Sequence, residues 1–288
     1  MKKNKVLIGI TTKNRVVILQ KAIDLALRQN YVDKEISVFD DNSDDDTGKL
    51  KDVFPQVSWT FSKVNRGLVY ARRHLIENTD AEYYCSVDDD SWFMDDDCLT
   101  HAVDYMNQNE NIAVLAFNIF TSDSPNGNLE TNKINCTNNF IGCGHLLRVS
   151  HVRKVGNYPR NPGFYGAEEK DLCIRLIDAG YDIVNFPSVK VWHDKTPFAR
   201  DLKKQHRSGV CNDLVFMWRR TPLLLLFPSF FKKIYVNATF PFRKKMPYLF
   251  IPFLLGSKDF FLSLITFKVK REPVSYKGLS KYIKLSKK

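Results

Sequence analysis

Three consecutive carboxylates, Asp88-Asp89-Asp90, follow an apolar stretch at residues 83–87. Three negative charges at the end of a buried strand are costly, because desolvation and mutual repulsion both oppose ionisation. A divalent cation would relieve that cost, and carboxylate and phosphate oxygens are the ligands that Mg²⁺ and Mn²⁺ prefer. The triplet therefore indicates a metal site that could also hold a diphosphate. The alternative is a solvated acidic turn, since similar runs occur at 44–46 and 95–97.

The elements that lead to this triplet alternate between strands and helices. Apolar runs predict strands at residues 6–10, 36–39, 58–61 and 83–87, and helical periodicity predicts helices at 19–27, 68–77 and 99–107. Asn14 is a suitable N-cap for the first helix, and Asn30 could close it. The alternation predicts an α/β fold with a mostly parallel, Rossmann-like sheet flanked by helices. Ligands of such sheets bind beyond the carboxyl ends of the strands, where the polar clusters lie at 11–15, 40–43 and 88–90.

The chain beyond the triplet continues this pattern after one long interruption. A strand is expected at 112–120, a long surface loop at 121–140, a helix that ends at Gly180 and a strand at 182–186. We place the end of the first domain near residue 200. Residues 201–288 form a separate C-terminal region.

Four short motifs stand in a characteristic order at these strand ends. They are Thr11/Thr12-Lys-Asn14-Arg15, Asp40-Asp41-Asn42-Ser43, Asn65-Arg-Gly67 through Ala71-Arg72, and Asp88-Asp-Asp90. Together they resemble the inverting family 2 glycosyltransferases of GT-A fold, of the bacterial polysaccharide type. The resemblance implies a nucleoside-diphosphate sugar as donor, such as a UDP- or dTDP-sugar, and a hydroxyl of a glycan or lipid-linked molecule as acceptor. It also implies that residues 1–200 form the catalytic domain, with a nucleotide-sugar half at about 1–110 and an acceptor half at about 111–200.

The same resemblance implies roles for the motif residues. Thr11, Arg15 and either Asp40 or Asp41 would line the nucleotide pocket, with the aspartate accepting a hydrogen bond from the base. The residues expected beside them at the nucleotide sugar are Asn65, Arg72, Asp88 and Asp89. From the residues alone, the Asp40 turn could be a simple Asx-turn, and Arg72 could lie on a solvated helix face.

A second acidic cluster lies in the segment Gly166-Ala-Glu168-Glu169-Lys-Asp171. It resembles the family segment that carries the general base, so Glu169 takes the base position and Glu168 and Asp171 match the flanking acids. The family usually has aspartate there, and glutamate reaches farther, so Glu168 is the alternative base. The competing interpretation is structural: acids at a helix N-terminus are stabilised by the helix dipole, and Asp171 pairs with Arg175 one turn on.

The resemblance further implies that Asp88 and Asp90 hold a divalent cation, Mn²⁺ or Mg²⁺. His193, after a strand-like segment, is a candidate third ligand, because neutral imidazole suits Mn²⁺ better than Mg²⁺. His145 is a weaker candidate on the acceptor side, and a lone histidine is more often an ordinary surface or core residue. With Glu169 as base, the acceptor oxygen would attack opposite the leaving diphosphate and invert the anomeric configuration.

The positive charge of the chain is concentrated in its C-terminal region. Residues 201–288 hold 19 Lys/Arg against 4 Asp/Glu, whereas residues 1–200 hold 24 against 28. Apolar runs at 222–231, 246–256 and 260–267 alternate with basic residues, and none has the roughly 18–20 uninterrupted apolar residues that span a bilayer. We predict basic amphipathic helices that lie peripherally on the anionic inner face of the cell membrane. The alternatives are a helical subdomain packed on the catalytic domain and a homodimer interface.

Other classes of function fit the sequence less well. The net charge of +11 could attract nucleic acid, but the acidic region 1–200 would repel it and carries no nucleic-acid motif. A sugar-1-phosphate nucleotidyltransferase would need an early glycine-rich loop, which residues 11–15 lack. The apolar run at 6–10 is too short for a secretory signal, and the six cysteines show no C-x-x-C spacing. We therefore expect a cytoplasmic protein with reduced thiols.

Overall fold

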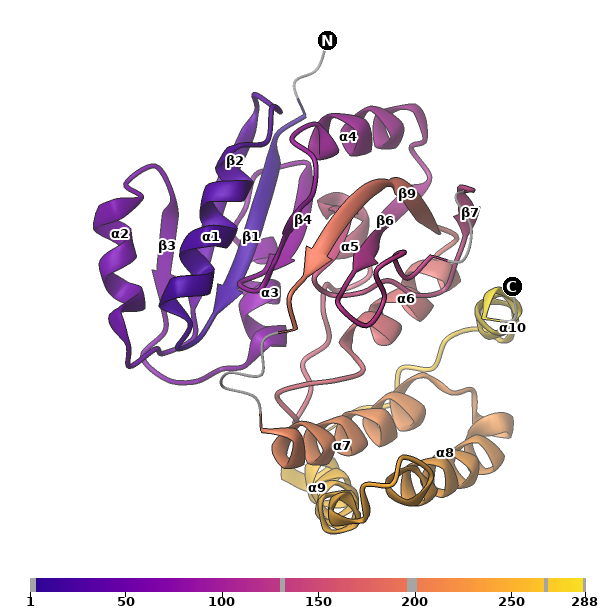
Figure 1. Cartoon of the computed structure of the whole chain (residues 1–288). Helices are drawn as coiled ribbons and strands as arrows, with labels where there is room; N and C mark the ends of the chain where they lie inside the picture. Colours follow the sequence, from indigo (N-terminus) through magenta and orange to yellow (C-terminus); the bar gives the residue numbers. More distant parts are fainter. Residues whose placement is uncertain (1–3, 130–132, 196–200, 267–268, 287–288) are drawn as a thin grey trace.

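A single mixed β-sheet forms the body of the protein, with helices on both faces and a group of C-terminal helices below it (Figure 1). The computed structural model describes residues 4–129, 133–195, 201–266 and 269–286. The strands are β1 (Val6–Thr12), β2 (Lys34–Asp40), β3 (Ser58–Phe61), β4 (Tyr83–Asp88), β5 (Ser91–Phe93), β6 (Ile112–Phe120), β7 (Asn135–Cys136), β8 (Gly144–Arg148) and β9 (Asp182–His193). Their order is β3-β2-β1-β4-β8-β6-β9-β5, and β7 pairs with β9.

The helices divide between the sheet and the C-terminal region. Those that pack on the sheet or its edges are α1 (Val16–Leu27), η1 (Asp46–Lys49), α2 (Leu50–Val53), α3 (Leu68–Glu77), α4 (Cys98–Gln108), α5 (Val149–Lys154) and α6 (Glu168–Asp178). Those of the C-terminal region are α7 (Leu202–Arg220), α8 (Leu223–Arg243), η2 (Pro247–Leu249), α9 (Phe250–Thr266) and α10 (Tyr276–Leu285). The predicted α/β fold class is confirmed.

The first half of the sheet is parallel, as the strand and helix alternation predicted. β3, β2, β1 and β4 all run in the same direction. β8 then enters antiparallel to both β4 and β6, while β9 runs parallel to β6. The chain between β6 and β8 contains no helix among its described residues, and antiparallel neighbours need no helical crossover. The carboxyl ends of β1, β2 and β4 therefore meet at one edge.

The alternation of side chains along β1 builds a core on each face of the sheet. Val6, Ile8 and Ile10 belong to the cluster that α1 and α4 cover, whereas Leu7 belongs to the cluster that α3, α5 and α6 cover. Gly9 faces the second cluster, where a Cβ would overlap the ring of Tyr84. The buried hydrophobic residues thus hold the strand ends at fixed positions.

The loop after β1 differs from the sequence prediction. α1 begins at Val16, and Asn14 is not its N-cap but adopts a left-handed conformation with φ of 55°. Its side-chain oxygen accepts a hydrogen bond from the amide of Asp44 at 2.7 Å, and its amide donates to Ser43 Oγ at 2.9 Å. Asn14 therefore joins the loops that follow β1 and β2. The helix ends at Leu27, before the predicted stop at Asn30.

The C-terminal helices pack on one another and on the catalytic body. α7 and α9 share a third hydrophobic cluster that includes Leu214, Phe253 and Phe260. α10 returns to α6, where the amide of Ser275 donates to Asp178 Oδ1 at 3.1 Å (Figure 1). This is the packed helical subdomain that the sequence left open as an alternative.

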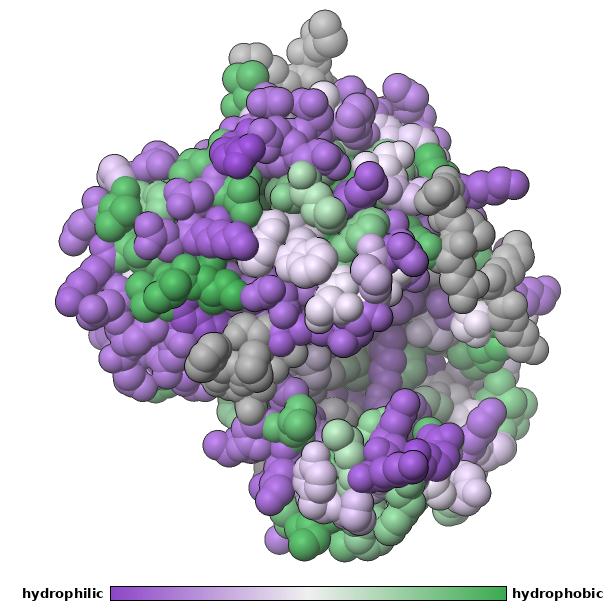
Figure 2. All heavy atoms as spheres, in the orientation of Figure 1, coloured by the Kyte–Doolittle hydropathy of each residue, from purple (hydrophilic) through white to green (hydrophobic). Residues whose placement is uncertain are grey.

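One helical stretch of the C-terminal region is long and apolar. Within the described residues, Pro247–Thr266 alone has the length and composition to cross a membrane. The sequence predicted separate segments here, but α9 continues as one helix through Lys258 and Asp259. A third of this stretch is buried against the rest of the protein. Figure 2 shows hydrophobic residues along the lower edge of the molecule, over this region.

Candidate active site

The loop after β1 and the aspartate triplet form one buried cluster. Asp89 is almost fully buried and accepts hydrogen bonds from Thr12 Oγ1 at 2.8 Å and from Arg15 Nη1 at 2.7 Å. Burial raises the pKa of Asp89 to about 6, although Arg15 acts to lower it. Asp89 thus orients the guanidinium of Arg15 at the strand edge. Thr11, buried between Phe39 and Asp88 in the sheet register, lies at the same edge.

The two aspartates at the end of β2, Asp40 and Asp41, both accept hydrogen bonds from backbone amides. Asp40 Oδ1 accepts a hydrogen bond from the amide of Ser43, three residues on, at 2.9 Å, so the carboxylate closes the turn in which it lies. Asp41 accepts from the amides of Arg66 at 2.6 Å and Gly67 at 2.8 Å. The Asp41 carboxylate therefore fixes the turn that starts α3, and Asn65 lies in that turn.

Arg72 connects the donor and acceptor halves of the predicted site. It is 1% exposed and does not lie on a solvated helix face. Its Nη2 donates to Asp88 Oδ1 at 2.6 Å, and its Nη1 lies 3.4 Å from Glu169 Oε1. One buried guanidinium therefore holds the strand-end carboxylate and the predicted base together. A Cβ on Gly142 would collide with Arg72 and Glu169, so the loop before β8 covers this pair closely.

Two neighbouring glutamates begin α6 in different environments. Glu168 is 2% exposed, and burial together with the charge of Glu169 raises its pKa to about 8. Burial also raises the pKa of Glu169, while Arg72 acts to lower it. Glu168 Oε2 is buried and has no hydrogen-bond partner within the described part of the chain. Of the two glutamates, Glu169 is the one that the Arg72 guanidinium contacts, and this contact favours its ionised form.

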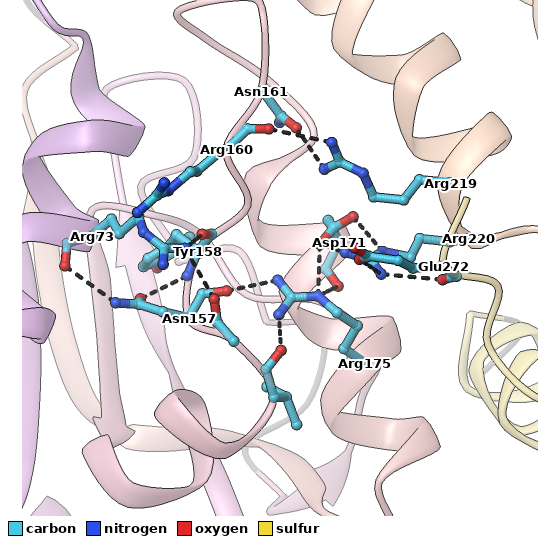
Figure 3. Close-up of polar contacts among 12 residues, drawn as sticks. Arg73, Asn157, Tyr158, Arg160, Asn161, Asp171, Arg175, Arg219, Arg220 and Glu272 are labelled. Atoms are coloured by element: carbon cyan, nitrogen blue, oxygen red, sulfur yellow. Dashed lines mark hydrogen bonds and ion pairs between the residues drawn. The ribbon is translucent and has the colours of Figure 1, made fainter. Parts of the chain in front are cut away.

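Asp171 of α6 lies in a buried ion network (Figure 3). Its carboxylate lies 2.7 Å from Arg175 Nε and 2.8 Å from Arg220 Nε. Burial alone would raise the pKa of Asp171, but the two arginines lower it. The pairing with Arg175 was the structural alternative from the sequence, and Arg220 of α7 adds to it. Asp171 therefore fastens α6 to the C-terminal region.

Asp90 and His193 form the candidate metal-ligand pair. Asp90 Oδ1 lies 3.3 Å from His193 Nε2, and that nitrogen is buried without a hydrogen-bond partner within the described residues. Two ligands about 2.1–2.2 Å from one ion and at right angles lie roughly 3 Å apart, so the spacing fits a shared cation. No group of three or more His, Cys, Asp or Glu side chains surrounds one point in the described chain. The protein would thus supply two close ligands and leave positions for diphosphate oxygens.

His145 lies beneath the site and not in it. It is fully buried, with Nδ1 3.1 Å from the carbonyl oxygen of Ile141 and Nε2 3.1 Å from the hydroxyl of Tyr158. Burial lowers its pKa to about 3, so it remains neutral. The weak sequence candidate is therefore a core histidine that supports the loop before β8.

Asn212 of α7 is a supporting residue that the sequence did not indicate. It is fully buried, and its Oδ1 accepts a hydrogen bond from the amide of Gly163 at 2.9 Å. Its Nδ2 lies 3.0 Å from the carbonyl oxygens of Gly163, Tyr165 and Gly166. These bonds hold the loop that enters α6. No local motif surrounds Asn212, so only the tertiary contact identifies it.

The fold and the site together define a glycosyltransferase. The model of the family described as "Glycosyl transferase family 2" matches residues 7–161, which is more than half of the chain, and the chain belongs to this family. An uncharacterized protein of Haemophilus influenzae is 33% identical over 106 residues, covering 33% of this chain and 57% of that protein. The chain thus spans little more than half the length of this relative.

Solved glycosyltransferase structures share the fold at low sequence identity. Mannosyltransferase PcManGT from Pyrobaculum calidifontis, in complex with GDP-Man and Mn²⁺, has a TM-score of 0.59 at 12% identity. The match covers 98% of this chain and 79% of the PcManGT chain. S. aureus TarS 1–349 in complex with UDP-GlcNAc has a TM-score of 0.64 at 12% identity, and the match covers 92% of this chain and 82% of the TarS chain. GalNAc-T7 with UDP, GalNAc and Mn²⁺ has a TM-score of 0.64 at 13% identity, and the match covers 92% of this chain and 57% of the GalNAc-T7 chain. The predicted GT-A fold is confirmed.

Proposed function

We propose that this glycosyltransferase is metal-dependent and inverting, and that it moves a sugar from a nucleoside diphosphate to a hydroxyl of a glycan or lipid-linked acceptor in surface polysaccharide synthesis. The contact of buried Arg72 with both Asp88 and Glu169 carries the proposal, because it puts a base beside the donor-side carboxylates. Family membership and neighbours whose structures contain GDP-Man, UDP-GlcNAc or UDP support it. The donor of this chain would be of that class, such as a UDP- or dTDP-sugar.

The donor would lie across the carboxyl ends of β1, β2 and β4. Thr11, Arg15 and Asp40 would contact the nucleotide, while Asp41 would hold the turn that presents Asn65. Arg15 is oriented by Asp89, so its guanidinium adds positive charge where the diphosphate lies. Asp88, together with Arg72, would meet the sugar at the junction with the acceptor half.

Asp90 and His193 would hold the divalent cation, with Asp88 close by at the strand end. A bound Mn²⁺ or Mg²⁺ supplies positive charge that stabilises the leaving diphosphate. The Mn²⁺ in the PcManGT and GalNAc-T7 structures supports this assignment, as does the unpartnered Nε2 of His193.

Glu169 would accept the proton of the acceptor hydroxyl as its oxygen attacks the anomeric carbon. Because Glu169 contacts the Arg72 guanidinium, which favours its carboxylate form, Glu169 is the better base of the two. Arg72 would keep Glu169 aligned, and Asp171 would position the start of α6 without touching substrate. Attack from the face opposite the diphosphate inverts the configuration.

A substitution pair tests the assignment of the base. We expect Glu169→Gln to lower the release of nucleoside diphosphate from the donor by about 10²–10⁴-fold, the usual value of a general base. The rise in melting temperature on adding UDP with Mn²⁺ should persist in this variant. Glu110→Gln, at the opposite end of the sheet before β6, is the matched control. Turnover near that of the wild type in Glu169→Gln would remove this residue as the base.

We further propose that α8 and α9 rest on the anionic inner face of the cell membrane. Leu224, Phe227 and Phe231 of α8 and Ile251 and Ile265 of α9 are all more than 60% exposed. The net positive charge of the region would add attraction to acidic lipids. A homodimer that buries these faces is the competing arrangement.

Vesicle flotation of the full chain tests the membrane proposal. We expect binding to vesicles that contain phosphatidylglycerol, and weaker binding when Phe227 and Phe231 are both changed to serine. Val17→Ser with Val32→Ser removes two apolar side chains of the catalytic body that are more exposed than either phenylalanine, and is the control. A chain that stays unbound, or that elutes as a dimer, would contradict membrane docking.

A further inference from the structure

A groove lies on the outer side of α3, next to the proposed site. It has a volume of about 460 Å³ and is formed by α3 and by the loop at residues 159–164. None of the roles proposed above uses its walls, apart from Asn65 at one end. The groove is therefore a separate space beside the donor position.

The groove is rich in arginine. Arg66, Arg73 and Arg160 line it, and the single carboxylate in its wall, Glu77, already pairs with Arg73 at 2.5 Å. Arg66 and Arg160 are exposed, and neither has a carboxylate partner within the described residues. Figure 3 shows Arg160 reaching from the loop toward Arg73. Among the described residues, Arg66 and Arg160 therefore leave two positive charges uncompensated at the groove, and a bound anion would pair with them.

Two aromatic side chains give the groove surfaces on which a sugar ring could pack. Tyr70 is 43% exposed and Phe164 is 62% exposed, and both line the cavity. The guanidinium of Arg66 lies 5.3 Å from the centre of the Tyr70 ring, so charge and aromatic surface occur side by side. A ligand with an apolar ring face and a negative group matches both features.

The position of the groove links it to both halves of the site. One end of the groove is the Asn65–Gly67 turn, which Asp41 of the nucleotide side holds by two hydrogen bonds. Phe164 covers Gly67 so closely that a Cβ there would lie 3.0 Å from Phe164 Cδ1. The loop that carries Phe164 continues directly into Glu168 and Glu169. A ligand in the groove would therefore lie where an acceptor approaches the base.

We infer that this groove binds an acidic unit of the acceptor, a sugar that carries a carboxylate or phosphate group. Arg66 and Arg160 would contact the negative group, while Tyr70 and Phe164 would contact the sugar ring. The inference rests on the proposed function, because it names the chemical class of the acceptor. It gives the arginines of the groove a role in acceptor selection and none in donor binding.

Ligand-observed NMR on the full chain tests this inference. The probes are methyl β-D-glucuronide, glucose 6-phosphate and the neutral methyl β-D-glucoside, each added separately. We expect saturation transfer to at least one acidic probe and little to the neutral one, and the pattern tells carboxylate from phosphate. Changing Arg66 and Arg160 together to glutamine should weaken that binding by about tenfold or more, because charge-assisted contacts are lost.

The controls separate this inference from the proposed function. Arg28→Gln removes an exposed arginine from α1 on the opposite face of the sheet and should leave acidic-probe binding unchanged. UDP with Mn²⁺ should stabilise the double variant as much as the wild type, because the groove does not hold the donor. Equal binding of the neutral and acidic probes, or unchanged binding in the double variant, would overturn the inference. Failure of UDP to stabilise the wild type would instead count against the proposed function.

Discussion

Replacing Asn212 with alanine should detach the loop that presents the base. Asn212 is fully buried in α7 and is the single side chain that reaches Gly163, Tyr165 and Gly166 together among the described residues. Alanine removes one acceptor and two donors and leaves buried backbone groups without partners. Each such hydrogen bond contributes about 1 kcal/mol net, and an orphaned buried group costs about 1–3 kcal/mol. The unfolding free energy should therefore fall by about 3–4 kcal/mol.

The same change should also lower turnover more than donor affinity. Glu169 follows this loop closely, and a displacement of about 1 Å at a catalytic group can reduce the rate about 100-fold. The donor contacts proposed above come from β1, β2 and β4, to which Asn212 makes no hydrogen bond within the described residues. We expect kcat to fall by at least about tenfold with little change in the donor KM.

Denaturant unfolding and steady-state kinetics measure the two effects. Asn237→Ala is the matched control, because Asn237 is also buried in the C-terminal region but its Nδ2 has no hydrogen-bond partner there. Asn212→Asp would put a buried carboxylate oxygen 3.0 Å from three carbonyl oxygens, so it should destabilise the protein at least as much as alanine does. If Asn212→Ala lost no more stability than Asn237→Ala and kept its kcat, the loop would not depend on α7.

Three further predictions concern the site itself. Gly142→Ala should lower kcat, because the new methyl group would collide with Arg72 and Glu169. Gly209→Ala, which has open space around its Cβ, should leave kcat unchanged, and steady-state kinetics compare the two variants. Burial and the charge of Glu169 raise the pKa of Glu168 from 4.5 in the unfolded chain to about 8 in the folded protein. Its contribution to the free energy of unfolding is therefore complete below pH 4.5 and declines up to about pH 8. Glu168→Gln should flatten the plot of melting temperature against pH in that window, and an unchanged slope would contradict the raised pKa. Removal of divalent cations with EDTA should abolish most of the rise in melting temperature that UDP produces. His193→Ala should reduce this rise when Mn²⁺ is limiting. An equal rise with and without metal would refute the assignment of the metal ligands.

The sequence predicted the first half of the fold well, because each element there has a clear local signal. The strands at 58–61 and 112–120 and the helix at 68–77 occur with the predicted bounds. Apolar periodicity fixes such elements, and parallel pairing then brings their carboxyl ends together. The antiparallel entry of β8 was not predicted, because pairing direction depends on the path of the long segment before it.

The site was only partly accessible from the sequence for the same reason. The motif residues near Thr11, Asp40, Arg72 and Asp88 lie at one edge, since each follows a strand or begins a helix there. Asn14 was assigned wrongly as a cap, because its side chain bonds across to the next loop and not to its own helix. The bonds of Asn212 and Arg220 to the α6 region join residues about 40 to 50 positions apart, which no local pattern records.

The dependence of the α6 loop on α7 has a consequence for how the protein matures on the ribosome. The nucleotide contacts proposed at the ends of β1, β2 and β4 come from residues before position 100, whereas Glu169 and the proposed metal ligand His193 are synthesised later. The start of α6, which carries Glu169, is fixed in place only after Arg220 has been synthesised and has paired with Asp171. We expect an incomplete chain that stops near residue 200 to take up nucleotide yet to transfer nothing, so unfinished molecules would not consume activated sugar.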